Sequence, residues 1–144
     1  MNECDNLLHK IDVRAAIFKN GKILLVQQKN NTWALPGGIC NTSETISQNI
    51  RKKVSEQTGV DISIKSVISI QTVSSCKKST SQEGICKILL LCTITDNANT
   101  PLADMSSFFG FEAFPSLATE YTSEDQLYLC FDALRAQNVT THID

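Results

Sequence analysis

Apolar and polar residues alternate along two stretches of the chain, the pattern expected of half-buried strands. In "IDVRAAIFKNGKILLVQQ" (11–28), two strand-like runs meet at Asn20-Gly21, a dipeptide that accepts the positive φ angles of a type I′ turn. The second stretch, "VDISIKSVISIQTV" (60–73), predicts one strand. The apolar run "ICKILLLCTIT" (85–95) predicts a buried strand, and "SSFFGFEAF" (106–114) predicts a short last one.

Two segments have the periodicity of helices. Three apolar residues at a spacing of four predict one buried stripe: Ile46, Ile50 and Val54. Thr45 with Gln48 fits a capping box, and Gly59 supplies a left-handed stop. In a final helix, which we expect Thr122 to cap, one face carries Leu127, Phe131 and Leu134. Polar segments at 74–84 and 97–101 predict a loop and a turn, so the order of elements indicates an α+β or α/β sandwich.

The composition fits one domain over residues 1–144, with a short N-terminal extension at 1–10. The net charge is −2 and there is no long basic block, so we expect no nucleic-acid partner. No 18-residue apolar run or signal-like start is present, which predicts a cytoplasmic protein without a membrane partner. The six cysteines form no C-x-x-C pair, and we expect reduced, structural thiols rather than a zinc site.

One segment carries a more specific pattern. "WALPGG" (33–38) leads into Gly38, five residues, Glu44, seven residues, and then "KKVSEQTGV" (52–60). This resembles the Nudix box, G-x5-E-x7-R-E-U-x-E-E-x-G-U, with U an aliphatic residue, and the frame at 38–60 is complete. The resemblance covers most of the chain. It implies the Nudix fold, a mixed β-sheet sandwiched between α-helices.

The resemblance also implies a chemistry. Nudix hydrolases cut a diphosphate linkage with Mg²⁺ or Mn²⁺, and the family places glutamates at positions 53, 56 and 57. This chain has Lys53, Glu56 and Gln57, so the formal charge of the trio changes from −3 to +1 − 1 + 0 = 0. An ammonium roughly 6 Å from a divalent ion would repel it by about 5 kcal/mol at an effective dielectric constant of about 20. We therefore expect a metal site that is weak or absent, with Glu56 as its remaining ligand.

The candidate site residues follow from the box positions. As catalytic residues the resemblance implies Glu56, Glu44 and Lys53, and as substrate-binding residues Gly37, Gly38, Lys52 and Trp33. Lys52 would pair with Glu44 and brace the loop. Lys53 would either contact a phosphate or form an ion pair with Glu56. The candidates for a further acid are Glu83, Asp104, Glu112 and Glu120.

Three functions remain open at this point. The first is a Nudix-type hydrolase of a nucleoside diphosphate linked to another moiety, ADP-ribose-like or CDP-alcohol-like, with weak or altered activity. The second is a catalytically inactive module that binds a nucleotide or nucleotide sugar. The third is a scaffold for protein–protein contact, which no feature of the sequence specifically supports. Many family members dimerise, and a homodimer is a state to test here.

Overall fold

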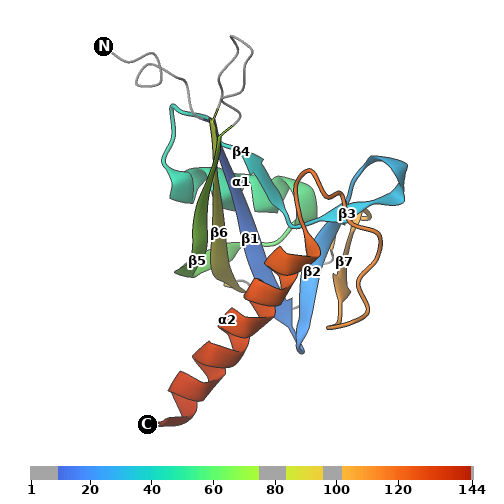
Figure 1. The fold of residues 1–144 in the computed structure, drawn as a ribbon, viewed down its shortest axis with the longest axis vertical. Coiled ribbons are helices and arrows are strands. Elements are labelled where there is room, and N and C mark those ends of the chain that lie inside the picture. Colours follow the sequence, from blue (N-terminus) through green and yellow to red (C-terminus); the bar gives the residue numbers. More distant parts are fainter. Residues whose placement is uncertain (1–9, 75–83, 96–101, 144) are drawn as a thin grey trace.

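The computed structural model describes residues 10–74, 84–95 and 102–143, with side chains to Gln137. It is a mixed sheet with helix α1 behind it and helix α2 in front of it, as Figure 1 shows. The strands and helices are β1 (Lys10–Lys19), β2 (Lys22–Gln27), β3 (Trp33–Ala34), β4 (Gly37–Ile39), α1 (Ile46–Thr58), β5 (Ile62–Ser74), β6 (Gly84–Ile94), β7 (Ser106–Phe109) and α2 (Glu124–Ile143).

Strand β1 lies at the centre of the sheet and pairs with β2, β4 and β6. The strand order is β3-β2-β1-β6-β5, and β4 pairs with β1 while β7 pairs with β2. Strands β1 and β6 run parallel, from Lys10 opposite Ile85 to Ile17 opposite Cys92, and the other pairs are antiparallel. The short strand β4 therefore joins the sheet along β1, and the box helix α1 follows it.

The predicted mixed sheet between helices is confirmed, and the alternation along the strands explains the two cores. On the α1 side, buried residues of three strands pack with Ile50 and Val54: Val13, Ala15, Ile17, Leu24, Ile88, Leu90 and Cys92. On the α2 side, their neighbours in sequence pack with Leu127 and Phe131: Ala16, Ile23, Leu25, Leu89 and Leu91. In each of these three strands, successive side chains therefore point alternately into the two cores.

The local signals in the turn after β1 and at both ends of α1 are confirmed. Asn20 and Gly21 have φ angles of 54° and 78°, as a type I′ turn between β1 and β2 requires. Thr45 and Gln48 form a complete capping box at the start of α1. Gly59 ends the helix in the left-handed conformation, with φ of 79°.

The predicted cap of α2 is wrong by one residue. Ser123 forms the capping box, accepting from the Gln126 backbone N–H at 3.2 Å while the Gln126 side chain accepts from the Ser123 backbone N–H at 2.9 Å. Thr122 is fully buried, and its hydroxyl oxygen accepts a hydrogen bond from the Leu35 backbone N–H at 2.9 Å. It ties the start of α2 to the segment that enters the glycine pair.

The last strand is shorter than predicted. Strand β7 ends at Phe109, and a turn follows in which the Ala113 N–H donates to the Gly110 carbonyl. Phe111 lies beyond the strand and packs edge-on against Phe131 of α2, with ring centroids 5.3 Å apart. Most of the predicted loop at 74–84 and turn at 97–101 lies outside the described residues. Among the described helices, none is long and apolar enough to cross a membrane.

Candidate functional site

The first glycine of the pair that begins the site is required by close backbone contact. A Cβ atom placed on Gly37, at φ of 139°, would lie 2.0 Å from the Val13 carbonyl oxygen, closer than any real contact. Gly38, at φ of 151°, is half-buried, and a Cβ placed there would lie 3.8 Å from Cδ of Lys53. Only glycine at position 37 lets β4 approach β1, and the Lys53 side chain runs along Gly38.

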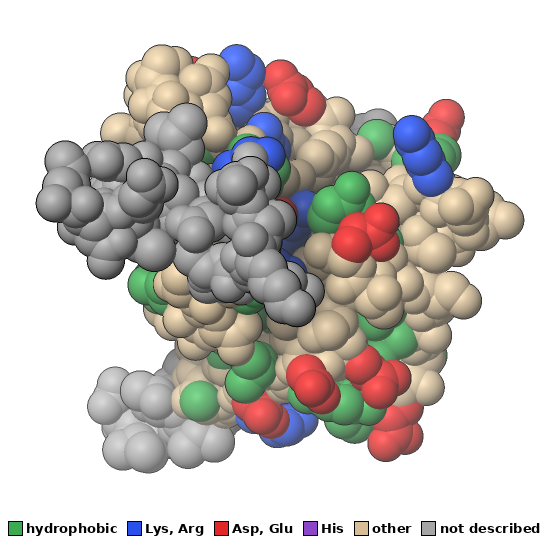
Figure 2. Space-filling view, turned by 45° about the horizontal axis from the view of Figure 1, so that its top comes forward, with side chains coloured by type: hydrophobic (Ala, Val, Ile, Leu, Met, Phe, Trp, Pro, Cys, Tyr) green, Lys and Arg blue, Asp and Glu red, His purple; other side chains and the backbone are tan. Residues whose placement is uncertain are grey.

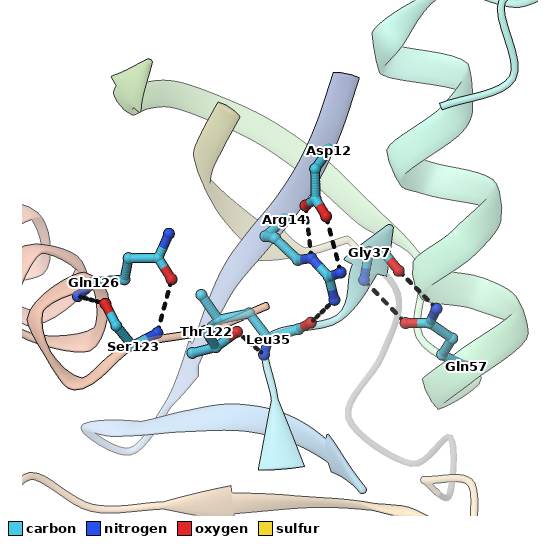
Figure 3. Close-up of polar contacts among 8 residues, drawn as sticks. All are labelled: Asp12, Arg14, Leu35, Gly37, Gln57, Thr122, Ser123 and Gln126. Carbon is cyan, nitrogen blue, oxygen red and sulfur yellow. Dashed lines mark hydrogen bonds and ion pairs between the residues drawn. The ribbon is translucent and has the colours of Figure 1, made fainter. Parts of the chain in front are cut away.

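The side-chain amide of Gln57 holds Gly37 from the helix side. Its Oε1 accepts from the Gly37 N–H at 2.9 Å, and its Nε2 donates to the Gly37 carbonyl oxygen at 2.8 Å. Figure 3 shows the two parallel bonds between α1 and β4. The amide satisfies both backbone groups as a neighbouring strand would, with no net charge. We call this pair of bonds the Gln57 clasp.

Asn49, a residue that the sequence analysis did not single out, braces the loop between β4 and α1. It is 2% exposed and accepts from the Asn41 N–H at 2.6 Å. Its amide donates to the carbonyl oxygens of Asn41 at 2.9 Å and Thr45 at 2.8 Å. Among the described residues no ion pair joins the predicted partners Lys52 and Glu44, so Asn49 performs the bracing expected of them.

Lys53 and Glu56 are both available to a ligand. Lys53 is half-buried, Glu56 is exposed, and neither forms an ion pair with a residue that the structure describes. Burial raises the pKa of the nearby Cys40 thiol, the Lys53 ammonium opposes that shift, and the Asp12 carboxylate adds to it. The positive charge of Lys53 therefore acts beside β4, close to the glycine pair.

A buried ion pair lies on the other side of the same segment. Arg14 Nε lies 2.8 Å from Asp12 Oδ1 and Arg14 Nη2 lies 3.1 Å from Asp12 Oδ2, a bidentate geometry. Arg14 Nη1 donates to the Leu35 carbonyl oxygen at 2.9 Å, and its guanidinium lies 5.0 Å from the centre of the Tyr121 ring. Arg14 is the register partner of Gly37, so this ion pair lies beside the glycine segment, on the side opposite Gln57 (Figure 3).

The sequence contained a signal for this pair that the analysis missed. Asp12 and Arg14 are two charges at a spacing of two within an otherwise apolar strand, so both must lie on one face of it. Their side chains are 8% and 9% exposed, respectively. Buried charges need partners, and two opposite charges on one strand face are each other's nearest candidates.

The remaining candidates are dispersed. Trp33 is half-buried and packs edge-on against Phe109, with ring centroids 5.0 Å apart. Glu44 borders a cavity of about 540 Å³ at the loop before α1. Three of the acids considered as a further catalytic group are exposed, and the fourth, Glu83, lies outside the described residues: Asp104, Glu112 and Glu120.

Comparison with known proteins places this geometry in a family. The model of the NUDIX domain matches residues 8–129. The chain belongs to the Nudix family. That match includes the glycine pair, the whole of α1 and the first residues of α2.

Individual relatives agree with the Nudix assignment. The chain is 28% identical over 138 residues to the putative ADP-ribose pyrophosphatase YjhB of Bacillus subtilis (strain 168), covering 94% of this chain and 66% of that protein. A solved ADP-ribose pyrophosphatase from Streptococcus suis 89-1591 is 31% identical, with a TM-score of 0.70 and coverage of 88% and 92%. A solved UDP-X diphosphatase is 25% identical, with a TM-score of 0.72 and coverage of 90% and 64%. The chain thus spans slightly less than two thirds of YjhB and of the UDP-X diphosphatase.

The Nudix family generally uses divalent metals, and the residues present here do not fit such a centre. Within the described part of the chain no three His, Cys, Asp or Glu side chains lie together so as to hold an ion. The Gly37 carbonyl oxygen, a hard ligand of the kind that Mg²⁺ prefers, already accepts the Gln57 N–H. Lys53 adds positive charge where the family pattern has a carboxylate.

Proposed function

We propose that this Nudix protein binds a nucleoside diphosphate linked to another moiety, ADP-ribose-like or CDP-alcohol-like, and hydrolyses it slowly. The observation that carries the proposal is the combination of the Gln57 clasp with Lys53 beside Gly38. The fold and the glycine segment of the family are kept, while an amide and an ammonium replace two carboxylates. Such a site retains attraction for phosphate and loses most attraction for a cation.

The proposed ligand class draws support from the relatives. Two of them carry the name ADP-ribose pyrophosphatase, one marked as putative, and a third is a UDP-X diphosphatase. All three names describe a diphosphate bridge between a nucleoside and another group. We extend that class to this chain, and no nucleic acid is part of the proposal. A cytoplasmic location and a homodimer stay predictions.

The site also has the charge for such a ligand. In Figure 2 the end of the sheet near β4 is turned toward the viewer, and Lys and Arg side chains lie in the upper and central part of this face. Acidic side chains lie among them and in the lower part of this face. The positive charge nearest the glycine pair is that of Lys53, which runs along Gly38, and it would attract a diphosphate and raise the rate of encounter.

Each candidate residue receives a role in the proposal. Lys53 contacts a phosphate oxygen and neutralises part of the charge that develops there. Glu56 accepts a proton from the attacking water and is the one carboxylate left for a weakly held cation. Gly38 lets the backbone approach the diphosphate, next to Gly37. Lys52, Glu44 and Trp33 flank this centre as secondary contacts.

The reaction balances without an added reactant. The water oxygen forms a bond to one phosphorus while the bond from that phosphorus to the bridging oxygen breaks. The bridging oxygen leaves on the other phosphate. Because both phosphate monoesters are mainly dianions at neutral pH, the net reaction releases both protons of the water. The products are two phosphate monoesters. Without a preformed cation centre, we expect turnover to be slow because one ammonium supplies less charge than a divalent ion.

A second candidate is a module that binds this ligand and does not cleave it. The Gln57 clasp favours it, because both backbone groups of Gly37 are occupied and uncharged. The same clasp makes the glycine segment rigid without metal, so the pocket needs no cation to form.

Calorimetric titration of ADP-ribose, UDP-glucose and CDP-choline, in Mg²⁺ and in EDTA, combined with a product assay, tests the proposal. We expect binding of at least one conjugate in EDTA, and slow formation of phosphate monoesters. Binding without product would support the module, and no binding under either condition would contradict both candidates.

One substitution tests whether the observed hydrolysis comes from this protein or from a contaminating enzyme. Glu56→Gln should abolish the residual hydrolysis while binding persists, because it removes the proposed base and keeps the shape of the side chain. Glu124→Gln, on the first turn of α2, is the matched control and should leave turnover unchanged. Equal turnover in the Glu56 variant and the wild type would place the reaction elsewhere.

A further inference from the structure

A polar cavity lies close to the glycine segment. It has a volume of about 500 Å³ and is enclosed by two segments that are far apart in the sequence, residues 28–32 and residues 117–121. That volume is in the range of pockets that hold small molecules in proteins. None of the candidate site residues derived from the box lies in its wall. Glu120, which was considered separately as a further acid, does lie there.

The walls of this cavity are fixed by the strand that enters the glycine pair. The Trp33 N–H donates to the Ser116 carbonyl at 2.9 Å, and the Ala118 N–H donates to the Trp33 carbonyl at 2.8 Å. The Leu35 N–H donates to the Thr122 hydroxyl at 2.9 Å. Because these bonds hold the segment before α2 against β3, the cavity is formed in advance of any ligand.

Tyr121 connects the cavity to the diphosphate site. It lines the cavity, and its ring lies 5.0 Å from the guanidinium carbon of Arg14. Arg14 is in turn the register partner of Gly37. The cavity and the glycine pair thus share one neighbour, Arg14. In the proposed function, a ligand with its phosphates at the glycine pair would extend its far end toward this cavity.

The lining has the chemistry of a site for hydroxyl groups. Asn30 and Gln28 offer amides, Thr119 offers a hydroxyl, and Glu120 and Lys29 add an acceptor and a donor. None of these five side chains forms a hydrogen bond or ion pair within the described part of the chain. Sugar hydroxyls donate and accept at once, so a mixed set of free donors and acceptors beside one aromatic ring suits them.

Other moieties fit this cavity less well. A quaternary ammonium such as choline is held by several aromatic faces, and among the lining residues only Tyr121 is aromatic. Lys29 would also repel it. A nucleobase is usually held in an apolar slot, whereas here the apolar side chains of the wall are only Leu117 and Ala118.

We propose that the cavity between residues 28–32 and 117–121 is the subsite for a sugar joined to the nucleoside through the diphosphate. The inference rests on the proposed function and narrows it from any linked moiety to a sugar. Asn30, Thr119 and Glu120 bind the hydroxyls, Tyr121 packs against the ring, and the nucleoside lies at the opposite end of the diphosphate.

Paired titrations of the 144-residue chain test the subsite. The pairs are ADP with ADP-ribose, UDP with UDP-glucose, and CDP with CDP-choline. We expect the sugar conjugate of at least one pair to bind more tightly than its diphosphate, and Asn30→Gly to weaken that conjugate about five- to tenfold. The diphosphates alone and CDP-choline should be unaffected by the substitution.

Asn30 allows a clean substitution because its φ of 62° suits glycine. Asn20→Gly, at φ of 54° in the turn between β1 and β2, is the matched control and should change no affinity. If conjugates and diphosphates bind equally and Asn30→Gly changes neither, the subsite is overturned while the proposed function stands. An equal loss for ADP and ADP-ribose would place the nucleoside there and also overturn it. If nothing binds, the subsite falls together with the proposed function.

Discussion

The amide of Gln57 and the ammonium of Lys53 set the character of the glycine segment. An amide can donate to the Gly37 carbonyl oxygen and accept from its N–H at the same time. A carboxylate in that place would accept from the N–H but set a second oxygen against the carbonyl oxygen, a pair that a cation would bridge. The loss of two carboxylates was readable in the sequence. The clasp was not, because it depends on the outer edge of β4 facing α1.

The buried pair of Asp12 and Arg14, beside that segment, should contribute measurably to the free energy of unfolding. Asp12→Asn leaves Arg14 charged and without an ionic partner, and should lower the free energy of unfolding by about 3 kcal/mol. Urea denaturation measures it. Asp132→Asn breaks the exposed pair of Asp132 with Arg135, whose side chains are both 62% exposed, and should cost at most about 0.5 kcal/mol. Equal losses in the two variants would show that the buried pair is not held as described.

The two helices differ in whether the neighbouring sequence is enough to predict the N-cap residue. At α1 the capping box of Thr45 with Gln48 lies directly before the apolar stripe of the helix, and it was predicted correctly. At α2, Thr122 and Ser123 are both good caps, and each has a residue three positions on that could complete a box. The choice is made by Leu35, whose N–H needs the Thr122 hydroxyl. That partner is 87 residues away in the sequence, so no local pattern contains it.

Substitutions at these two residues distinguish the assignments. Ser123→Ala should lower the free energy of unfolding by about 1 kcal/mol through loss of the cap. Thr122→Val keeps the shape but leaves the Leu35 N–H buried without an acceptor, and should cost about 1–3 kcal/mol. Thermal unfolding by circular dichroism measures both. A stable Ser123 variant beside a destabilised Thr122 variant would instead favour Thr122 as the cap.

At the scale of the whole molecule, two cores share one sheet. Alternating stretches and one continuous apolar run predicted its strands, and in that run neighbouring residues such as Leu89 and Leu90 point to opposite sides of the sheet. The parallel pairing of β1 with β6 and the branch of β4 from β1 were not predicted. They depend on contacts between segments about 75 residues apart, for which the sequence pattern of a single strand carries no information.

One thiol in each core reports on the intactness of the molecule. Burial raises the pKa of Cys92, on the α1 side, and of Cys130, on the α2 side, each to about 12. The reactive thiolate is therefore scarce at pH 8. We expect iodoacetamide to leave both unmodified in the native protein and to modify both once urea unfolds it, as read by peptide mass spectrometry. Modification of only one of the two in dilute urea would show that the cores open separately.

The central claim is that an amide and an ammonium have replaced the carboxylates of a metal site. Calorimetric titration of Mn²⁺ into the wild type and into the Lys53→Glu/Gln57→Glu double variant tests it most directly. We expect weak or undetectable binding to the wild type and binding at least tenfold tighter to the variant, because the substitution removes a repulsive charge and adds two carboxylates. Gln48→Glu, in the capping box of the same helix, should not bind Mn²⁺ more tightly. Equal Mn²⁺ affinity in the wild type and the double variant would contradict the account.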